Sequence, residues 1–164
     1  MNAQQYLAAN AHISTVVVGY RLNAALSGGH EGLYPRLPKG GTESETWAHL
    51  LRTLQVLRDS DKQVILMLQV PELPRDIHYL AMRASPADQD LAGATRAWWD
   101  ERTRWVFEHL HEVPAGVIVI DPTTAFCDDR QCRASSRGKA LYFDDDHPSI
   151  SGASLLAKLI SARL

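Results

Sequence analysis

The stretch QVILMLQV, residues 63–70, is apolar along almost its whole length and is followed directly by Pro71. A short apolar run of this kind, closed by a proline, predicts a strand that is buried on both faces of a sheet. Two similar runs flank it in the chain, STVVVGY at 14–20 and GVIVIDP at 116–122. Because strands buried on both faces are typical of parallel sheets, these three runs set the expectation for the fold.

The segments between the strands predict helices. Residues 43–58 carry Trp47 and four leucines at helical spacing, with acidic residues in the first turn and Arg58 at the end. Further helices are expected over 76–84, 90–112 and 151–164.

Two of these expected helices carry specific predictions. In the helix at 90–112, Trp98, Trp105 and Leu110 are expected to face inward, which leaves Trp99 as its most exposed tryptophan. In the terminal helix, Ser151 is a plausible N-cap.

Residues 22–42 hold five of the ten glycines and two prolines, and they predict a long loop. Strands alternating with helices predict an α/β fold, a parallel sheet with helices on both faces. The length of 164 residues fits one domain.

The bulk composition narrows the possible partners and the location. The net charge of −2 gives no sign of a nucleic-acid partner. No apolar run approaches the ~18–20 residues that cross a bilayer, and the N-terminus lacks the pattern of a signal peptide. These features alone predict a soluble cytoplasmic chain.

The two cysteines, Cys127 and Cys132, have four residues between them in FCDDRQC. The spacing suits a small loop closed by a disulfide, and equally two unpaired thiols that happen to be close. A zinc site is less favoured, because the spacing is not CxxC and no second ligand pair follows.

The run DDDH, residues 144–147, is the strongest candidate for chemistry. Ligands of open α/β sheets bind beyond the carboxyl ends of the strands. A single turn can fold the Asp144 carboxylate onto Nδ1–H of His147, leaving Nε2 to take a proton from a nucleophile. Asp145 and Asp146 are then turn residues, with Asp146 a candidate cap for the following helix. The alternative is a solvated acidic turn with a surface histidine.

A divalent-metal site on Asp144, Asp146 and His147 is a further alternative. Such strand-end residues supply only part of a coordination shell, and the sequence shows no other clustered ligands. We therefore expect neither a metal nor another cofactor.

The stretch YFDDDHPSISGASLL resembles the last conserved block of the SGNH hydrolase superfamily, in the version fused to membrane acyltransferase-3 domains. That block reads Y-F/Y-D-D-D-H-L-S-x-x-G-A, and this chain departs from it at Pro148. Three other stretches resemble blocks of the same family, in the same order: VVVGYRLNAAL, TLQVLRDSDKQVILMLQVPELPRD and VIVIDPTTAFCDDRQC.

The resemblance implies a flavodoxin-like three-layer fold and a Ser-His-Asp triad, with Asp144 as its acid and His147 as its base. It places Arg21 where the wider superfamily has an oxyanion-binding asparagine. A guanidinium could supply such a donor, although Arg21 could equally form an ordinary salt bridge. Asn23 is a weaker candidate donor and is expected in a turn. The resemblance also favours a disulfide between Cys127 and Cys132.

The family's first block, a strand ending in G-D-S with the nucleophilic serine, has no match here. Ser27 is the only serine in a glycine-rich turn and is a poor candidate. The chain is therefore expected to be the C-terminal part of an SGNH domain, inactive by itself because its base has no serine to deprotonate.

By resemblance, the intact parent would transfer or hydrolyse an O-acyl group, most plausibly acetyl, on cell-envelope carbohydrate. Its partners would be the carbohydrate or acyl-ester substrate and the missing N-terminal segment or acyltransferase-3 membrane domain. It would act at the periplasmic face of the inner membrane. The alternative is a non-catalytic remnant that binds glycan or a partner protein.

Overall fold

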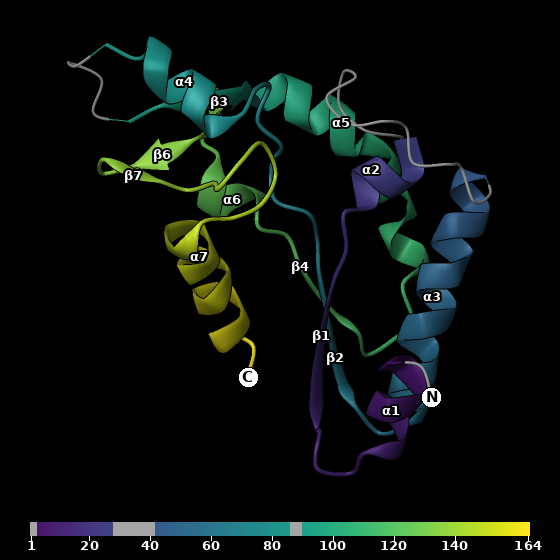
Figure 1. Cartoon of the computed structure of the whole chain (residues 1–164). Helices are drawn as coiled ribbons and strands as arrows, with labels where there is room; N and C mark the ends of the chain where they lie inside the picture. The colour runs from purple at the N-terminus through teal and green to yellow at the C-terminus, as the bar shows by residue number, and fades with distance from the viewer. Residues whose placement is uncertain (1–2, 28–41, 86–89) are drawn as a thin grey trace. The chain divides into compact units, whose positions relative to one another are not determined.

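The structure, a computed structural model, describes residues 3–27, 42–85 and 90–164 (Figure 1). The chain forms two compact units, each with its own apolar core. The first unit comprises Met1–Gln69 and Trp105–Ile120, and the second comprises Val70–Arg104 and Asp121–Leu164. Within the described ranges, no helix combines the length and the apolar character that crossing a bilayer requires.

The first unit is built on the parallel sheet that the apolar runs predict. Its strands β1 (Thr15–Gly19), β2 (Gln63–Met67) and β4 (Ile118–Ile120) lie in the order β1-β2-β4, all parallel (Figure 1). The register places Val17 beside Ile65. The expected α/β class and all three expected strands are thereby confirmed, with slightly shorter bounds than the apolar runs.

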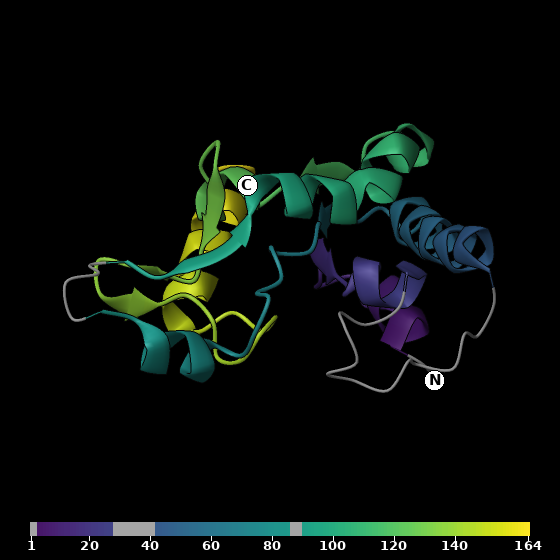
Figure 2. The same cartoon turned by 90° about the horizontal axis from the view of Figure 1, so that it is seen from above.

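Helices of the first unit pack on an apolar core that includes one face of this sheet. Helix α3 (Glu43–Asp59) begins with a capping box: the Thr42 hydroxyl accepts from the Glu45 N–H, and the Glu45 carboxylate accepts from the Thr42 N–H. α3 contacts α1 (Ala3–Ala9) and α2 (Leu22–Ser27) (Figure 2). The buried core residues are Val16, Leu22, Leu26, Trp47, Leu54, Leu57, Val64, Leu66, Leu68 and Val106.

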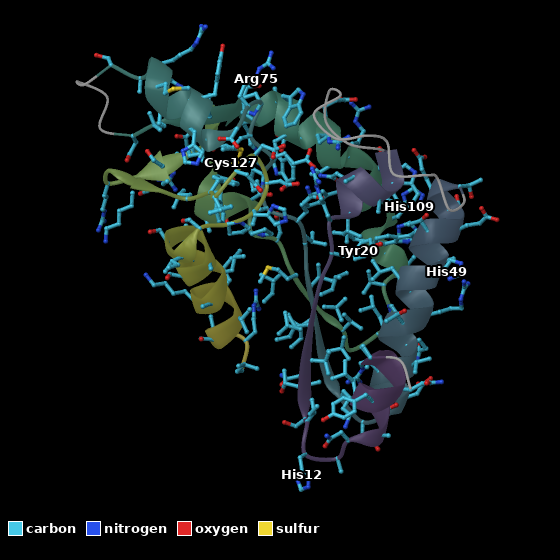
Figure 3. All side chains as sticks on the ribbon, in the orientation of Figure 1. His12, Tyr20, His49, Arg75, His109 and Cys127 are labelled. Atoms are coloured by element: carbon cyan, nitrogen blue, oxygen red, sulfur yellow. A yellow bond between two sulfur atoms is a disulfide. The ribbon has the colours of Figure 1, made fainter. Side chains whose placement is uncertain are left out.

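An aromatic group completes this core. Helix α5 (Arg96–His109) runs directly into the 3-10 turn η1 (Leu110–Glu112). Trp105 meets Trp47 edge-on, with ring centroids 5.7 Å apart, and the ring of His109 (labelled in Figure 3) stacks on Trp105 with centroids 3.8 Å apart. The inward direction predicted for Trp105 is confirmed.

The second unit combines short helices with two antiparallel pairs of strands. Its elements are α4 (Ile77–Arg83), β3 (Ala92–Thr95), α6 (Thr123–Phe126), β5 (Gln131–Arg133), β6 (Ser135–Ser136), β7 (Lys139–Ala140), α7 (Ile150–Ser161) and the first residues of α5. β3 pairs with β5, and β6 pairs with β7. The core residues are Val70, Leu73, Ile77, Trp99, Phe126, Cys127, Cys132, Ala134, Leu141 and Tyr142.

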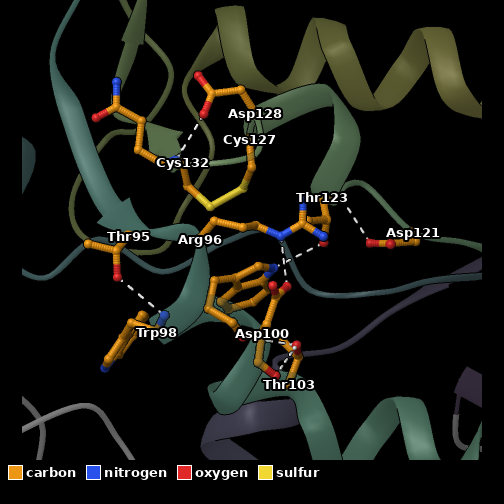
Figure 4. A network of polar contacts seen from close by, with 12 residues as sticks. Thr95, Arg96, Trp98, Asp100, Thr103, Asp121, Thr123, Cys127, Asp128 and Cys132 are labelled. Carbon is orange, nitrogen blue, oxygen red and sulfur yellow. Dashed lines mark hydrogen bonds and ion pairs between the residues drawn. A yellow bond between two sulfur atoms is a disulfide. The ribbon is translucent and has the colours of Figure 1, made fainter.

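A disulfide joins Cys127 to Cys132 across the turn between α6 and β5 (Figure 4). The Asp128 carboxylate accepts from the N–H groups of Arg130 and Gln131, which orders the enclosed turn. Cys132 is fully buried. The cross-link thereby holds β5 at the edge of the second core, where β3 pairs with it.

Residues 92–95 are the largest departure from the sequence-based expectation, because they form β3 and not the start of a helix. A Cβ added at Gly93 would lie 2.7 Å from a Leu73 methyl and 2.8 Å from the Cys132 carbonyl oxygen, so glycine permits the close approach to β5. The Thr95 hydroxyl accepts a hydrogen bond from the Trp98 N–H, at the point where α5 begins (Figure 4).

The prediction for the tryptophans of α5 was wrong in part. Trp99 is only 1% exposed, and its Nε1–H donates to the Thr123 hydroxyl at 3.0 Å (Figure 4). Trp98 is partly buried and packs against the second core, as Trp105 does against the first, so its inward direction is confirmed. Because the helix begins at Arg96, the face that bears Trp99 packs into the second core. The periodicity of the longer segment, residues 90–112, did not predict this orientation.

Two further predictions were wrong: the loop expected from residue 22 onward, and Ser151 as the N-cap of the terminal helix. Residues 22–27 form α2 rather than loop, because Leu22 and Leu26 share the face that enters the first core; residues 28–41 lie outside the described residues. α7 is capped by Ser149, whose hydroxyl accepts from the N–H groups of Ser151 and Gly152.

Gly152 supports a stability prediction, because a Cβ there would lie well inside contact distance of the Leu141 carbonyl oxygen. Helix propensity alone would make Gly152→Ala stabilising by about 1 kcal/mol. We expect instead a loss of about 1–3 kcal/mol of unfolding free energy, because backbone must move to admit the methyl group. Urea unfolding measures the change.

The matched control is Ala153→Ser, on the next, exposed residue of the same helix. We expect it to change the unfolding free energy by at most about 0.5 kcal/mol. A Gly152→Ala protein as stable as the parent would contradict the close packing of α7 on Leu141.

Candidate active site

The turn at residues 144–147 is closed by the side chain of its first residue. Oδ1 of Asp144 accepts hydrogen bonds from the N–H groups of Asp146 at 2.9 Å and of His147 at 2.8 Å. Aspartate commonly bonds the backbone two or three residues ahead in this way, and the pattern forms a compact turn. The histidine is therefore brought back over the carboxylate that starts the turn.

Neighbouring segments fix the backbone of this turn. The Phe143 N–H donates to the His147 carbonyl at 2.7 Å, which draws the two ends of the turn together. The Leu73 N–H donates to the Asp145 carbonyl at 2.7 Å, and the Ile77 N–H donates to the Asp144 carbonyl at 3.3 Å. The turn is thus held from within and from the segment that leads into α4.

The same turn brings the imidazole of His147 against the second oxygen of Asp144. Nδ1 of His147 lies 2.7 Å from Oδ2 of Asp144. A carboxylate accepting from Nδ1–H selects that tautomer and makes Nε2 the nitrogen that can take up a proton. The His147 side chain is 69% exposed, against 22% for Asp144, so the ring stands at the surface of the unit on a partly buried support.

The pKa of Asp144 is lowered in this setting. Burial works against the charge and by itself raises the pKa, but the N–H groups of Asp146 and His147 and the imidazole of His147 together outweigh it. Asp144 is therefore held as a carboxylate, the form that accepts all three hydrogen bonds.

Asp146 contacts the imidazole, an arrangement that the sequence analysis considered only within the alternative metal site. Its Oδ1 lies 2.8 Å from Nδ1 of His147, and its side chain is only 2% exposed. The candidate role of Asp146 as a helix cap was wrong, since Ser149 caps α7. Adjacent side chains usually diverge, so spacing alone gave no signal that residue 146 faces its neighbour.

A buried ion pair supports the segment that holds the turn. Nε of Arg102 lies 2.8 Å from Oε2 of Glu72, whose side chain is 1% exposed. A buried carboxylate is costly unless it is paired, so the guanidinium stabilises Glu72 in this position. Glu72 directly precedes Leu73, whose N–H binds the Asp145 carbonyl.

Asp144, Asp146 and His147 also form the one group within the described ranges that could hold a metal ion, with ligand-type atoms within 4.8 Å of one another. The contacts between Nδ1 and the two carboxylates account for this closeness without an ion.

The remaining predicted residues lie in the first unit. Arg21 is half-buried and directly precedes α2. Asn23 was expected in a turn but lies within α2, is 2% exposed, and donates its backbone N–H to the Gln69 side chain at 2.9 Å. No described residue accepts a hydrogen bond from its buried Nδ2. Ser27 is the last residue of α2, and its side chain lies outside the described residues.

A carboxylate that orients an imidazole, at the surface of an α/β protein with a parallel sheet, is the acid–base arrangement of hydrolases and acyltransferases. The family model of the SGNH domain (fused to AT3 domains) matches residues 1–162. The chain therefore belongs to this family, as the sequence blocks predict.

The fold is similar to that of a solved structure, the periplasmic domain of a lipopolysaccharide acetyltransferase from Salmonella ser. Paratyphi A. The two are 14% identical with a TM-score of 0.60, and the match covers 92% of this chain and 56% of that one. This chain thus spans about half of the length of that domain. No curated protein matches the chain.

The lowered pKa of Asp144 predicts a contribution to acid sensitivity. Because the folded-state pKa lies below the ordinary value of 3.8, ionised Asp144 stabilises the fold above that value, and the contribution is lost as the pH falls through the folded-state pKa. Between about pH 6 and about pH 3, we expect the unfolding free energy of the parent to fall more steeply than that of Asp144→Asn.

Urea unfolding at a series of pH values measures this slope. Asp129→Asn is the control, because it removes the same charge from an exposed residue of the same unit and should keep the slope of the parent. Parallel slopes for the parent and Asp144→Asn would contradict the proposed hydrogen bonding of the carboxylate.

Proposed function

We propose that this chain supplies the acid–base part of an SGNH domain that transfers or hydrolyses O-acyl groups. The observation that carries the proposal is the 2.7 Å contact between Oδ2 of Asp144 and Nδ1 of His147, on a turn closed by the same carboxylate. Membership in the family of SGNH domains fused to AT3 domains supports it.

In this function, His147 is the general base and Asp144 is the acid that orients it. Nε2 takes the proton from a serine hydroxyl as the serine oxygen bonds to the acyl carbon. The imidazolium then returns the proton to the departing alkoxide, which leaves an acyl-enzyme. In the second half-reaction, Nε2 takes a proton from the acceptor hydroxyl, or from water, as that oxygen bonds to the acyl carbon. The imidazolium then returns the proton to the departing serine oxygen, which frees the acylated acceptor or the carboxylic acid.

We place the serine outside these 164 residues, because no serine of the chain stands in a G-D-S context. The chain is then the C-terminal part of the domain. That its match covers 56% of the Salmonella domain supports this assignment. Arg21 is our candidate for a donor to the oxyanion, since a guanidinium N–H can stabilise charge that develops on the carbonyl oxygen.

The substrate we propose is an acyl ester, specifically acetyl, on a cell-envelope carbohydrate. The similar Salmonella structure is the periplasmic domain of a lipopolysaccharide acetyltransferase, and the family model describes fusion to AT3 domains. We accordingly propose an acyltransferase-3 membrane domain as partner and the periplasmic face of the inner membrane as location. The Cys127–Cys132 disulfide suits such an oxidising compartment.

The test is the O-acetyl content of envelope carbohydrate in cells that make the complete gene product. We expect His147→Ala to lower acetylation by at least about 100-fold, the lower range for loss of a general base. His111→Ala, at an exposed histidine of the first unit, is the control and should leave acetylation unchanged. Unchanged acetylation in His147→Ala would refute the proposal and favour a binding remnant.

The isolated chain provides a second test of where the nucleophile lies. We expect its turnover of p-nitrophenyl acetate to equal that of its His147→Ala variant, because the base has no serine to activate. Clear turnover that depends on His147 would show that the nucleophile lies within these residues.

A further inference from the structure

Two carboxylates meet the same nitrogen of His147, and they do so in different ways. Asp144 forms the hydrogen bond, with Oδ2 at 2.7 Å from Nδ1. Asp146 approaches Nδ1 with Oδ1 at 2.8 Å, a contact that is an ion pair when the imidazole is protonated. A single Nδ1–H has one direction, so the direction of the ring is set by Asp144, and the contribution of Asp146 is mainly its charge.

The charge of Asp146 is better shielded from water than that of Asp144. The Asp146 side chain is 2% exposed and the Asp144 side chain 22%. Solvent screens a buried charge least, so at equal distance a buried carboxylate acts more strongly on the imidazole.

The protonation state of the ring decides whether this arrangement is favourable. One oxygen of each carboxylate lies within 4.8 Å of the other. If the imidazole is neutral, the two negative charges repel each other at a site that is partly shielded from water. With an imidazolium between them, each carboxylate gains an opposite charge. The geometry therefore favours the protonated ring when no substrate is bound.

Other charged groups near the turn do not supply the negative charge that Asp146 places beside the imidazole. In the segment that binds the turn through Leu73 and Ile77, Glu72 is paired with Arg102, Arg75 is exposed (Figure 3), and the Asp76 carboxylate accepts from the His78 N–H at the start of α4. α7, which follows the turn, has no acidic residue in its first turn and carries its one basic residue, Lys158, in the last. Asp145 is buried within the turn, and its carbonyl oxygen accepts from the Leu73 N–H.

We propose that Asp146 is a positioning residue for His147: its buried carboxylate holds the imidazolium in place, while Asp144 sets the direction of the ring. This inference rests on the proposed function of His147 as the base. It adds that the two carboxylates raise the pH at which the imidazole becomes neutral and can act as the base.

The test is a pH titration of His147 by two-dimensional ¹H–¹⁵N NMR on the whole chain, which also reports the tautomer. In the parent we expect a pKa of His147 above about 7.5, one unit over the ordinary value near 6.5. In Asp146→Asn we expect the pKa to fall by at least about one unit, because the charge is removed. The neutral ring should keep its proton on Nδ1, because Asp144 still accepts it.

Two variants of neighbouring residues separate this role from a structural one. Asp145→Asn removes the same charge one residue away and should lower the pKa of His147 by less than half as much. Asp144→Asn should abolish the preference for the Nδ1–H tautomer, which Asp146→Asn retains. Equal shifts in Asp145→Asn and Asp146→Asn, or loss of the tautomer preference in Asp146→Asn, would overturn the proposal.

The parent titration keeps the proposal falsifiable even if Asp146→Asn does not fold. A pKa of His147 at or below about 6.5 in the parent would itself refute the proposed effect of the Asp146 carboxylate on the imidazole. This test is separate from the test of the acyl-transfer function. Loss of acetylation in His147→Ala together with an ordinary pKa of His147 would support the acyl-transfer function and refute the proposed role of Asp146. A raised pKa of His147 in the parent together with unchanged acetylation in His147→Ala would support the role of Asp146 and refute the acyl-transfer function.

Discussion

One carboxylate oxygen that accepts two backbone N–H groups is the constraint on which the site depends. Oδ1 of Asp144 binds the amides of Asp146 and His147, and this closes the turn that carries the histidine. The other oxygen is then left at 2.7 Å from Nδ1 of the ring. A single side chain thereby fixes the backbone and orients the imidazole, so the proposed catalytic geometry needs only four consecutive residues and a rigid support.

The second unit provides that support. The segment after the sheet binds the turn through the Leu73 and Ile77 amides, and the buried Glu72–Arg102 pair sits beside it. On the other side, Gly152 lets α7 approach the Leu141 carbonyl directly after the turn. Both supports lie in stretches on which the resemblance to the family rests: Glu72 and Leu73 in TLQVLRDSDKQVILMLQVPELPRD, and Gly152 in YFDDDHPSISGASLL.

The sequence predicted the features that depend on local patterns. Apolar runs identified β1, β2 and β4, the leucine spacing identified α3, and the two-residue gap between Asp144 and His147 identified their pairing. It failed at β3, which forms because Gly93 fits against the distant Cys132. It also failed at Asp146, which turns to the ring because the backbone of the tight turn directs it there. The part of Arg21 in catalysis stays a prediction.

The most direct measurement of the central interaction is the tautomer of the neutral His147 ring in the unmodified chain, read from its ¹⁵N chemical shifts at high pH. If Asp144 accepts from the ring as described, the proton resides on Nδ1 and Nε2 carries the lone pair. A neutral ring with its proton mainly on Nε2 would mean that the carboxylate does not hold the base, and the assignment of this turn as a catalytic site would be wrong.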